Sequence, residues 1–240
     1  MIRVARFLRG ALSGIFFVSY GVAALPAAVL LLPPVWPRFA VRFAIRWFYR
    51  VFVFFAAATG LFRVCMDAET RRALAGCRGR IVAMNHLSLL DVVVLMAFLG
   101  DSTAIAKAGA AKNPFLGMVV RRMFITNGQD AAKTLADAKR CLDAGVNVIV
   151  FPEGTRRRPT DAPAPIHRGV ARLALSCGAP VQAFHAEYRP LVLAKGQPWW
   201  DVGARTIRIV LSQRGVAAPQ GESNHRNAVA LTRRIGEMIA

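Results

Sequence analysis

Two segments of the sequence combine residue types that could carry out acid–base and anion-binding chemistry. In the first, residues 85–91 (NHLSLLD), His86 precedes Asp91 by five positions. If His86 lies in a turn and Asp91 in the helix that follows, the carboxylate can fold back toward an imidazole nitrogen. An aspartate on one ring nitrogen fixes the tautomer and leaves the other nitrogen as a general base. The spacing alone is equally compatible with a histidine that only caps a turn.

The second segment, residues 151–156 (FPEGTR), has the composition of a phosphate-binding turn. Gly154 permits close backbone approach, Thr155 offers a hydroxyl, and Arg156 begins a run of three arginines. Planar guanidinium groups match phosphate oxygens, so the segment indicates an anion pocket. A solvated loop with a charge run is the alternative.

Both segments directly follow apolar stretches that the pattern predicts as short strands, residues 80–84 and 146–151. Further strands are expected at 104–107, 181–185 and 205–211, helices at 88–99, 131–144 and 169–176, a Pro/Gly turn at 113–117, and a last helix capped by Ser223 and ending at Ile239. Strands separated by helices predict an α/β fold with a largely parallel, mixed sheet covered by helices. In such sheets chemistry lies at the carboxyl ends of the strands, where both segments fall.

Together the two segments resemble the glycerolipid acyltransferase family, which includes 1-acyl-sn-glycerol-3-phosphate acyltransferases. Residues 85–91 match the family's NHxxxxD motif, and residues 151–156 match FPEGTR without a change. Lys107, Pro114 and Gly117 fit the K...P..G connection between the motifs, and residues 168–169 and 178–181 fit the region after them. The resemblance covers about residues 75–190.

The resemblance implies that His86 is a general base oriented by Asp91, in an acyl transfer without a covalent enzyme intermediate. A thiol, with a pKa of about 8.5, is a far weaker base as a leaving group than an alkoxide, so activating the acceptor hydroxyl is the demanding proton transfer. By the same resemblance, the acceptor-binding residues are Lys107, Glu153, Gly154, Thr155 and Arg156.

No cofactor and no metal ion is expected, and the acyl donor is acyl-CoA or acyl carrier protein. The four cysteines, Cys65, Cys77, Cys141 and Cys177, are widely spaced and are expected to be reduced core thiols. His167, His185 and His225 are expected to be structural or surface residues, and no metal-ligand spacing is present.

One position departs from the family pattern. The family usually ends the segment after Lys107 with an arginine that adds to phosphate binding, whereas this chain has Asn127 there. Arg121 or Arg122 could supply the missing charge. Residues 193–201 (LAKGQPWWD) are similar to acyltransferases from polyene-lipid gene clusters, which points to a noncanonical acceptor.

Composition favours a lipid partner. The chain has 240 residues, of which 55% are hydrophobic and 19% charged, and its net charge is +19. These values exclude collagen, a coiled coil and an acidic disordered chain. A positive excess needs anionic surroundings, and in so hydrophobic a chain it favours anionic lipid over nucleic acid. An arginine-rich genome would explain part of the excess.

The N-terminal region is basic and apolar, since residues 1–66 carry eight arginines and no acidic residue. Residues 10–37 are uncharged and long enough to enter a bilayer, but Pro26 and the Pro33–Pro34 pair limit a straight helix. A kinked span, a re-entrant hairpin and a cleaved signal peptide remain open. Arginines flank the run on both sides, so charge does not orient it.

Arginines recur every four residues after this run, at positions 38, 42, 46 and 50, among aromatic residues such as Phe43, Trp47 and Phe54. This spacing predicts an amphipathic helix with one basic face, typical of a helix in the headgroup region. The alternative is an ordinary helix packed on the domain with a solvated arginine face.

The sequence thus predicts an N-terminal membrane-associated helical region, residues 1–63, and an acyltransferase domain, residues 64–240. The predicted protein is a membrane-bound O-acyltransferase of phospholipid biosynthesis that acylates a lysophospholipid such as lysophosphatidic acid. Its partners are the bilayer, the lysophospholipid and the acyl donor, and not nucleic acid. The catalytic domain is expected on the cytoplasmic side of the inner membrane, where thioester donors are found. A noncanonical lipid acceptor and a catalytically silent lipid-binding protein are the alternatives.

Overall fold

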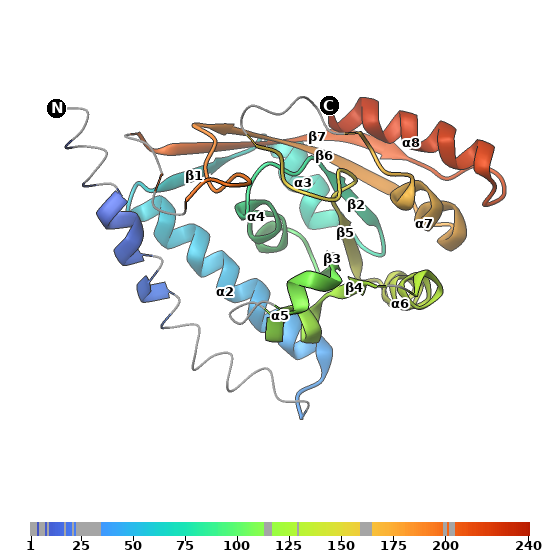
Figure 1. Cartoon of the computed structure of the whole chain (residues 1–240), viewed down its shortest axis with the longest axis horizontal. Helices are drawn as coiled ribbons and strands as arrows, with labels where there is room; N and C mark the ends of the chain where they lie inside the picture. Colours follow the sequence, from blue (N-terminus) through green and yellow to red (C-terminus); the bar gives the residue numbers. More distant parts are fainter. Residues whose placement is uncertain are drawn as a thin grey trace.

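The computed structural model describes residues 4, 8, 10–16, 18–20, 22, 35–112, 117–128, 130–158, 165–198, 201 and 205–240. A seven-stranded sheet in the order β1-β7-β6-β2-β5-β3-β4 forms its centre (Figure 1). The strands are β1 (Phe62–Cys65), β2 (Ile81–Met84), β3 (Ser102–Lys107), β4 (Ile125–Asn127), β5 (Asn147–Val150), β6 (Val181–Arg189) and β7 (Ile207–Ala217). Neighbouring strands are parallel except for β6 and β7, which confirms the predicted mixed, mostly parallel sheet.

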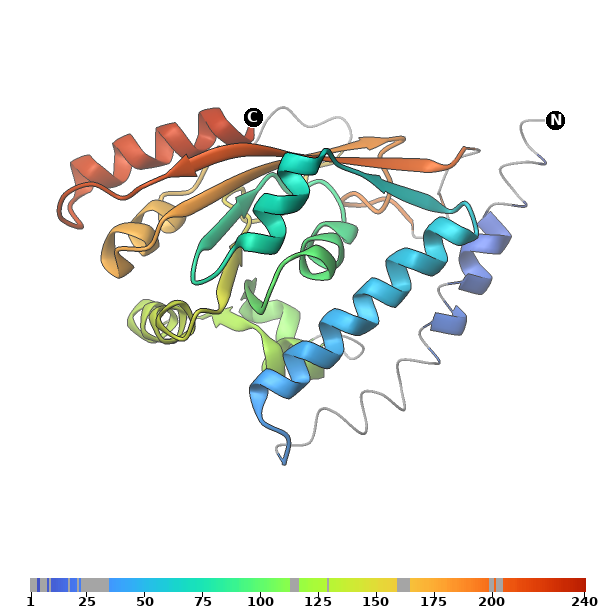
Figure 2. The same cartoon turned by 180° about the vertical axis from the view of Figure 1, so that it is seen from behind.

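Helices cover both faces of this sheet (Figures 1 and 2). They are α2 (Arg38–Ala58), α3 (Ala68–Gly76), α4 (Leu90–Phe98), α5 (Gly117–Met123), α6 (Ala131–Asp143), α7 (Gly169–Cys177) and α8 (His225–Ile239), with a short 3₁₀ helix η1 (Ala108–Lys112). Alternation along β2 divides the core: Val82 and Met84 pack with α2, α3 and α4, whereas Ile81 and Ala83 pack with α6, α7 and α8. The sheet is therefore buried on both faces, as its continuous apolar strands require.

The predicted elements are found with shifted ends. The last helix is capped by Asn224, whose side chain accepts from the backbone N–H of Asn227, and not by the predicted Ser223. Strands β6 and β7 are longer than expected, and β1, β4, α3 and α5 were not predicted. Residues 113–116 of the predicted turn lie outside the described residues, and Gly117 begins α5.

Helix α2 has two faces, as predicted, and two residues of its arginine face bond to the domain. Arg42 forms a two-point ion pair with Asp101 at 2.5 and 2.8 Å and is only 14% exposed. Arg50 donates from Nε to the carbonyl oxygen of Ala97 at 2.8 Å. The solvated-arginine alternative is therefore wrong for Arg42, because Asp101 in the loop after α4 pairs with it.

Several aromatic residues of α2 are exposed, whereas Phe52 is buried. Phe39, Phe43, Trp47 and Phe54 are 60–71% exposed and follow one another at helical spacing. Each of the first three comes one residue after an arginine, so the two rows lie about 100° apart around the helix. These four residues are called the aromatic row below.

Residues 10–16 and 18–20 are helical and lie beside α2 in both views (Figures 1 and 2). Phe16 and Tyr20 pack against Phe52 of α2, with ring centroids 5.2 and 4.8 Å away, in a tilted and an edge-on arrangement. Within the described ranges, no helix combines the length and the apolar character needed to cross a bilayer. Residues 23–34 of the predicted apolar run lie outside them, so its manner of membrane entry stays a prediction, as does the division of the chain at residue 63.

Candidate active site

The carboxyl ends of five parallel strands converge at one edge of the sheet and carry the predicted site. Along that edge, in the order of the sheet, stand the residues after β6, then His86 after β2, residues 151–156 after β5, Lys107 at the end of β3, and Asn127 at the end of β4. This is the edge at which open parallel sheets place ligands.

His86 and Asp91 are joined as the spacing predicted. Nδ1 of His86 lies 2.9 Å from Oδ2 of Asp91, and the imidazole is 19% exposed while the carboxylate is fully buried. Because a carboxylate oxygen accepts, this geometry places the ring proton on Nδ1 and leaves Nε2 as the nitrogen free to take a proton.

Asp91 is held by donors on both oxygens. Its Oδ2 accepts the backbone N–H groups of Leu87 and Ser88, each at 2.8 Å, in addition to His86. Its Oδ1 accepts the hydroxyl of Tyr188 at 2.6 Å. Four donors around one buried carboxylate suit its ionised form, which accepts and does not donate.

The ring of Phe151 fixes the plane of His86. The two rings stack with centroids 4.1 Å apart and an interplanar angle of 17°. The first residue of the FPEGTR segment therefore contacts the imidazole directly, which the motif did not reveal.

Glu153 ties the two motif segments together. It is 4% exposed, its Oε1 accepts the backbone N–H of His86 at 3.2 Å, and its Oε2 lies 3.0 Å from Nε of Arg157. Burial raises the pKa of Glu153, and the charge of Arg157 opposes that shift. Of the predicted acceptor-binding residues, Glu153 is thus engaged within the protein.

Arg156 is likewise bonded to the protein. Its Nη1 donates to the carbonyl oxygens of Leu193 at 2.7 Å and Ala194 at 3.4 Å. The carbonyl of Leu193 also accepts the N–H of Leu89, and Leu193 has a positive φ of 53°. Leu193 and Ala194 are therefore held by contacts from both motif segments.

Gly154 and Thr155 form the open part of the turn. Gly154 has a φ of +66°, a conformation that favours glycine, and a Cβ there would lie 3.1 Å from the ring of His167. Thr155 is exposed. His167 thus packs against the turn, while His185 bonds the carbonyl of Ile239 at 2.8 Å, consistent with a structural role.

Lys107 and Asn127 are brought side by side. They are register partners in the parallel pairing of β3 with β4, and both are exposed. Asn127, which stands where the sequence resemblance led us to expect an arginine, is therefore adjacent to Lys107. Arg121 and Arg122, the suggested substitutes, are bonded through their guanidinium groups to backbone carbonyls of Ala111 and Trp36.

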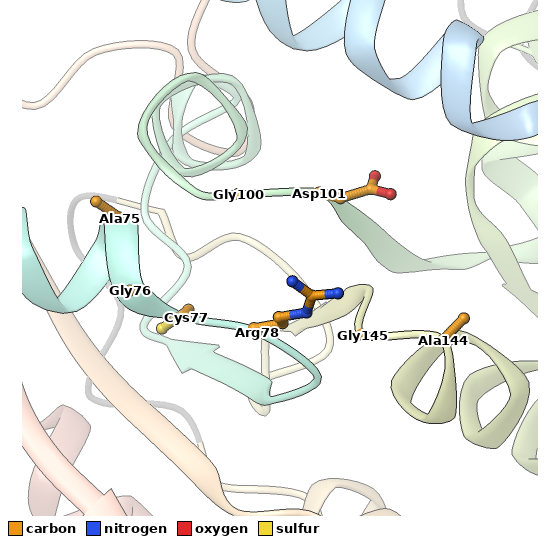
Figure 3. Close-up of a pocket in the computed structure, with 8 residues that line it drawn as sticks. All are labelled: Ala75, Gly76, Cys77, Arg78, Gly100, Asp101, Ala144 and Gly145. Atoms are coloured by element: carbon orange, nitrogen blue, oxygen red, sulfur yellow. The ribbon is translucent and has the colours of Figure 1, made fainter.

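A separate cavity of about 410 Å³ opens at the opposite edge of the sheet (Figure 3). Its lining comes from segments that precede β2, β3 and β5, and the residues are Ala75, Gly76, Cys77, Arg78, Gly100, Asp101, Ala144 and Gly145. Because His86 follows β2, this cavity is not part of the candidate active site.

The sequence did not indicate what two polar residues of the site do. Tyr188 lies 97 positions from the carboxylate that it contacts, so no spacing pattern could have indicated it. Asn85 belongs to the motif, and its buried amide exchanges two hydrogen bonds with the backbone of Ala186, at 2.8 and 2.9 Å.

The cysteines lie away from this chemistry. All four are free, and burial raises the pKa values of the thiols of Cys77, Cys141 and Cys177. A raised pKa disfavours the reactive thiolate, so none of these three is suited to act as a nucleophile.

Comparisons with known proteins identify the family and the fold of the chain. A family model described as Acyltransferase matches residues 54–186, more than half of the chain. The 1-acyl-sn-glycerol-3-phosphate acyltransferase of Helicobacter pylori (strain J99) is 28% identical over 120 residues, 48% of each protein, so the chain spans about half the length of this curated relative. The crystal structure of PlsC, the 1-acyl-sn-glycerophosphate (LPA) acyltransferase of Thermotoga maritima, has the same fold. The TM-score is 0.75 and the identity 21%, over 100% of this chain and 95% of that one.

Proposed function

Because the chain belongs to the acyltransferase family, we propose that it is a membrane-bound O-acyltransferase that acylates the free hydroxyl of a lysophospholipid such as lysophosphatidic acid. The acyl group comes from acyl-CoA or acyl carrier protein, and the product enters phospholipid biosynthesis. The observation that carries the proposal is the 2.9 Å contact between His86 and a fully buried Asp91 at the carboxyl edge of the sheet.

In the proposed mechanism, His86 acts as the general base. Its Nε2 takes the proton of the acceptor hydroxyl while that oxygen attacks the thioester carbonyl, and Asp91 stabilises the imidazolium that forms. The carbon–sulfur bond then breaks, and the proton passes from His86 to the departing thiolate. General-base catalysis of this kind contributes about 10² to 10⁴ in rate.

The acceptor headgroup is proposed to lie on the side of His86 where β5, β3 and β4 end. Thr155 and Lys107 are exposed at these strand ends and are proposed to contact the headgroup, whereas Glu153 is buried and bonded within the protein. Arg156 contributes a positive charge close to Asp91 while it holds the backbone of residues 193–194.

An acceptor other than lysophosphatidic acid is the second candidate, and Asn127 beside Lys107 favours it. A site with one fewer cation at the ends of β3 and β4 binds a phosphomonoester less strongly and discriminates less against a headgroup of lower charge. Comparing lysophosphatidic acid with a zwitterionic lysophospholipid separates the two candidates.

Membrane binding is proposed to use the aromatic row of α2. Aromatic side chains are favoured at the bilayer interface, and an amphipathic helix lies in that plane with its apolar face buried. Both the acceptor and the product are membrane lipids, so a membrane-bound enzyme can exchange them without exposing them to water. We place the domain on the cytoplasmic side of the inner membrane, where the acyl donors are found.

The first experiment is acyl transfer from a long-chain acyl-CoA, or from acyl carrier protein, to lysophosphatidic acid by wild-type membranes and by the His86→Ala variant. His225→Ala, an exposed histidine at the start of α8, is the matched control. We expect His86→Ala to lose at least about 10² in turnover while it stays membrane-bound, and the control to be unchanged. Normal turnover by His86→Ala would refute the mechanism. Wild-type protein that binds lysophospholipids but transfers nothing to any of them would indicate a silent lipid-binding protein.

A further inference from the structure

A tyrosine outside both motif segments holds the second oxygen of the Asp91 carboxylate. Tyr188 donates its hydroxyl to Oδ1 at 2.6 Å, while His86 and two backbone N–H groups occupy Oδ2. Among the described residues, Tyr188 supplies the one hydrogen bond that Oδ1 receives. It lies two residues beyond the stretch that the family model matches.

Strand β6 extends beyond the end of β2, and this extension places Tyr188 next to Asp91. Strand β2 ends at Met84, which pairs with Phe184, whereas β6 continues to Arg189. Beyond Met84, the side-chain amide of Asn85 replaces backbone pairing between the strands. It donates to the carbonyl oxygen of Ala186 and accepts from the N–H of Ala186. Phe184, Ala186 and Tyr188 alternate onto the face covered by α4, whose first turn carries Asp91.

The contact is shielded from water, which makes its hydrogen bond hard to replace. Asp91 is fully buried and Tyr188 is 9% exposed. Burial and the negative charge of Asp91 hold the pKa of Tyr188 well above its usual value, so the hydroxyl stays protonated and remains a donor. Removing it would leave a buried carboxylate oxygen without a partner, which is costly.

We propose that Tyr188 is a positioning residue for the reaction: by holding Oδ1 it fixes the rotation of the Asp91 carboxylate and so keeps Oδ2 on Nδ1 of His86. This inference rests on the proposed function, in which the tautomer of His86 determines whether Nε2 can accept a proton. Tyr188 itself contacts neither substrate in this scheme.

The kinetic test is Tyr188→Phe, with Tyr49→Phe as the matched control. Tyr49 is a tyrosine of α2 packed against the same core. We expect Tyr188→Phe to lower kcat about tenfold, because a hydrogen bond to a charged group is lost, and to leave KM for donor and acceptor within about twofold. An unchanged kcat in the folded variant overturns the proposal, as does a raised KM with an unchanged kcat.

A spectroscopic test measures the effect of the same contact on the tautomer of His86, in the absence of substrate. In protein labelled with ¹⁵N-histidine, the signals of His86 are identified by their loss in His86→Ala, and their shifts report the ring tautomer. We expect the Nδ1–H form in wild type and in Tyr49→Phe, and a mixture of tautomers in Tyr188→Phe. An unaltered tautomer in Tyr188→Phe contradicts the proposal. If wild type transfers acyl groups to no acceptor, the proposed function fails while this measurement still decides the role of Tyr188.

Should Tyr188→Phe not fold, fluorinated tyrosines keep the ring and the hydroxyl while making it a stronger acid. The chain has three tyrosines, so in a Tyr20→Phe, Tyr49→Phe background the analogue enters at Tyr188 alone. A graded change in kcat across the series supports the positioning role. A flat series overturns it.

Discussion

Replacing Asp91 by asparagine removes one buried negative charge at nearly constant size, and so measures what that charge does for His86. The contact of 2.9 Å puts the charge centres about 4 Å apart, and at the effective dielectric constant of about 20 that applies in proteins their attraction is about 4 kcal/mol. Loss of this attraction destabilises the imidazolium formed in the transition state. Since 1.36 kcal/mol is a factor of ten in rate, kcat should fall about 10³-fold.

Hydrogen bonding should largely survive in Asp91→Asn. The amide oxygen can accept from His86, Leu87 and Ser88, while the amide NH₂ turns to the hydroxyl oxygen of Tyr188. The tautomer of His86 is therefore kept, and the loss of rate reports charge rather than misorientation.

The assay is acyl transfer at saturating donor and acceptor, with unfolding followed in parallel to show that the variant is folded. Asp143→Asn is the control, because Asp143 lies on the exposed face of α6 in an ion pair with Lys139. We expect the control to match wild type, and KM to be nearly unchanged in both variants. A folded Asp91→Asn enzyme whose kcat stays within about tenfold of wild type would show that the charge of Asp91 is not used as proposed.

Three further predictions test the membrane surface and the motif turn. Replacing both Phe43 and Trp47 by serine should weaken binding to anionic vesicles at least tenfold in a sedimentation assay, since full burial of one such side chain is worth about 1.5–3 kcal/mol; undiminished binding would remove the aromatic row from the membrane contact. Because the pKa of Glu153 is raised on folding, its contribution to stability is fully present below the ordinary value of 4.5 and is lost as the pH rises through the higher folded value. The melting temperature of wild type relative to Glu153→Gln should therefore fall as the pH is raised from about 4.5 toward neutrality, and parallel melting curves would contradict the assignment. Arg156→Ala should mainly raise the acceptor KM, and an unchanged KM for a phosphorylated acceptor would place Arg156 outside the pocket.

The sequence was sufficient to predict the central strands, because they are continuous apolar runs that end at polar motifs. Strands β2 and β5 were located to within two residues for this reason. Strand β1 was missed because Arg63 interrupts its apolar run, and β4 was missed because it has three residues, of which two are polar. Pairing with β7 and β3 stabilises them, and that is a tertiary effect.

Motif spacing likewise predicted the contact between His86 and Asp91, but it did not predict the more distant residues that hold the site together. The contact of His86 with Asp91 is local, five positions apart, so helix geometry predicts it. The contacts of Tyr188 with Asp91 and of Arg156 with Leu193 join segments 97 and 37 positions apart, and only the order of strands in the sheet brings them together.

The orientation of α2 is the clearest feature that the sequence pattern did not predict. The four-residue spacing correctly predicted an arginine face, but a charged face is usually taken to be the solvated one. Here the arginine face meets the carboxyl end of α4, where Arg50 bonds the carbonyl of Ala97 and Arg42 pairs with Asp101. Cations are favoured there by the helix dipole, just as the carboxylate of Asp91 is favoured in the first turn of the same helix. Ala97, which Arg50 of α2 contacts, and Asp91, which orients His86, are six residues apart on α4, a rise of about 9 Å along the helix. If the aromatic row rests on a bilayer as proposed, packing of α2 on α4 sets the depth at which the lipid hydroxyl meets His86.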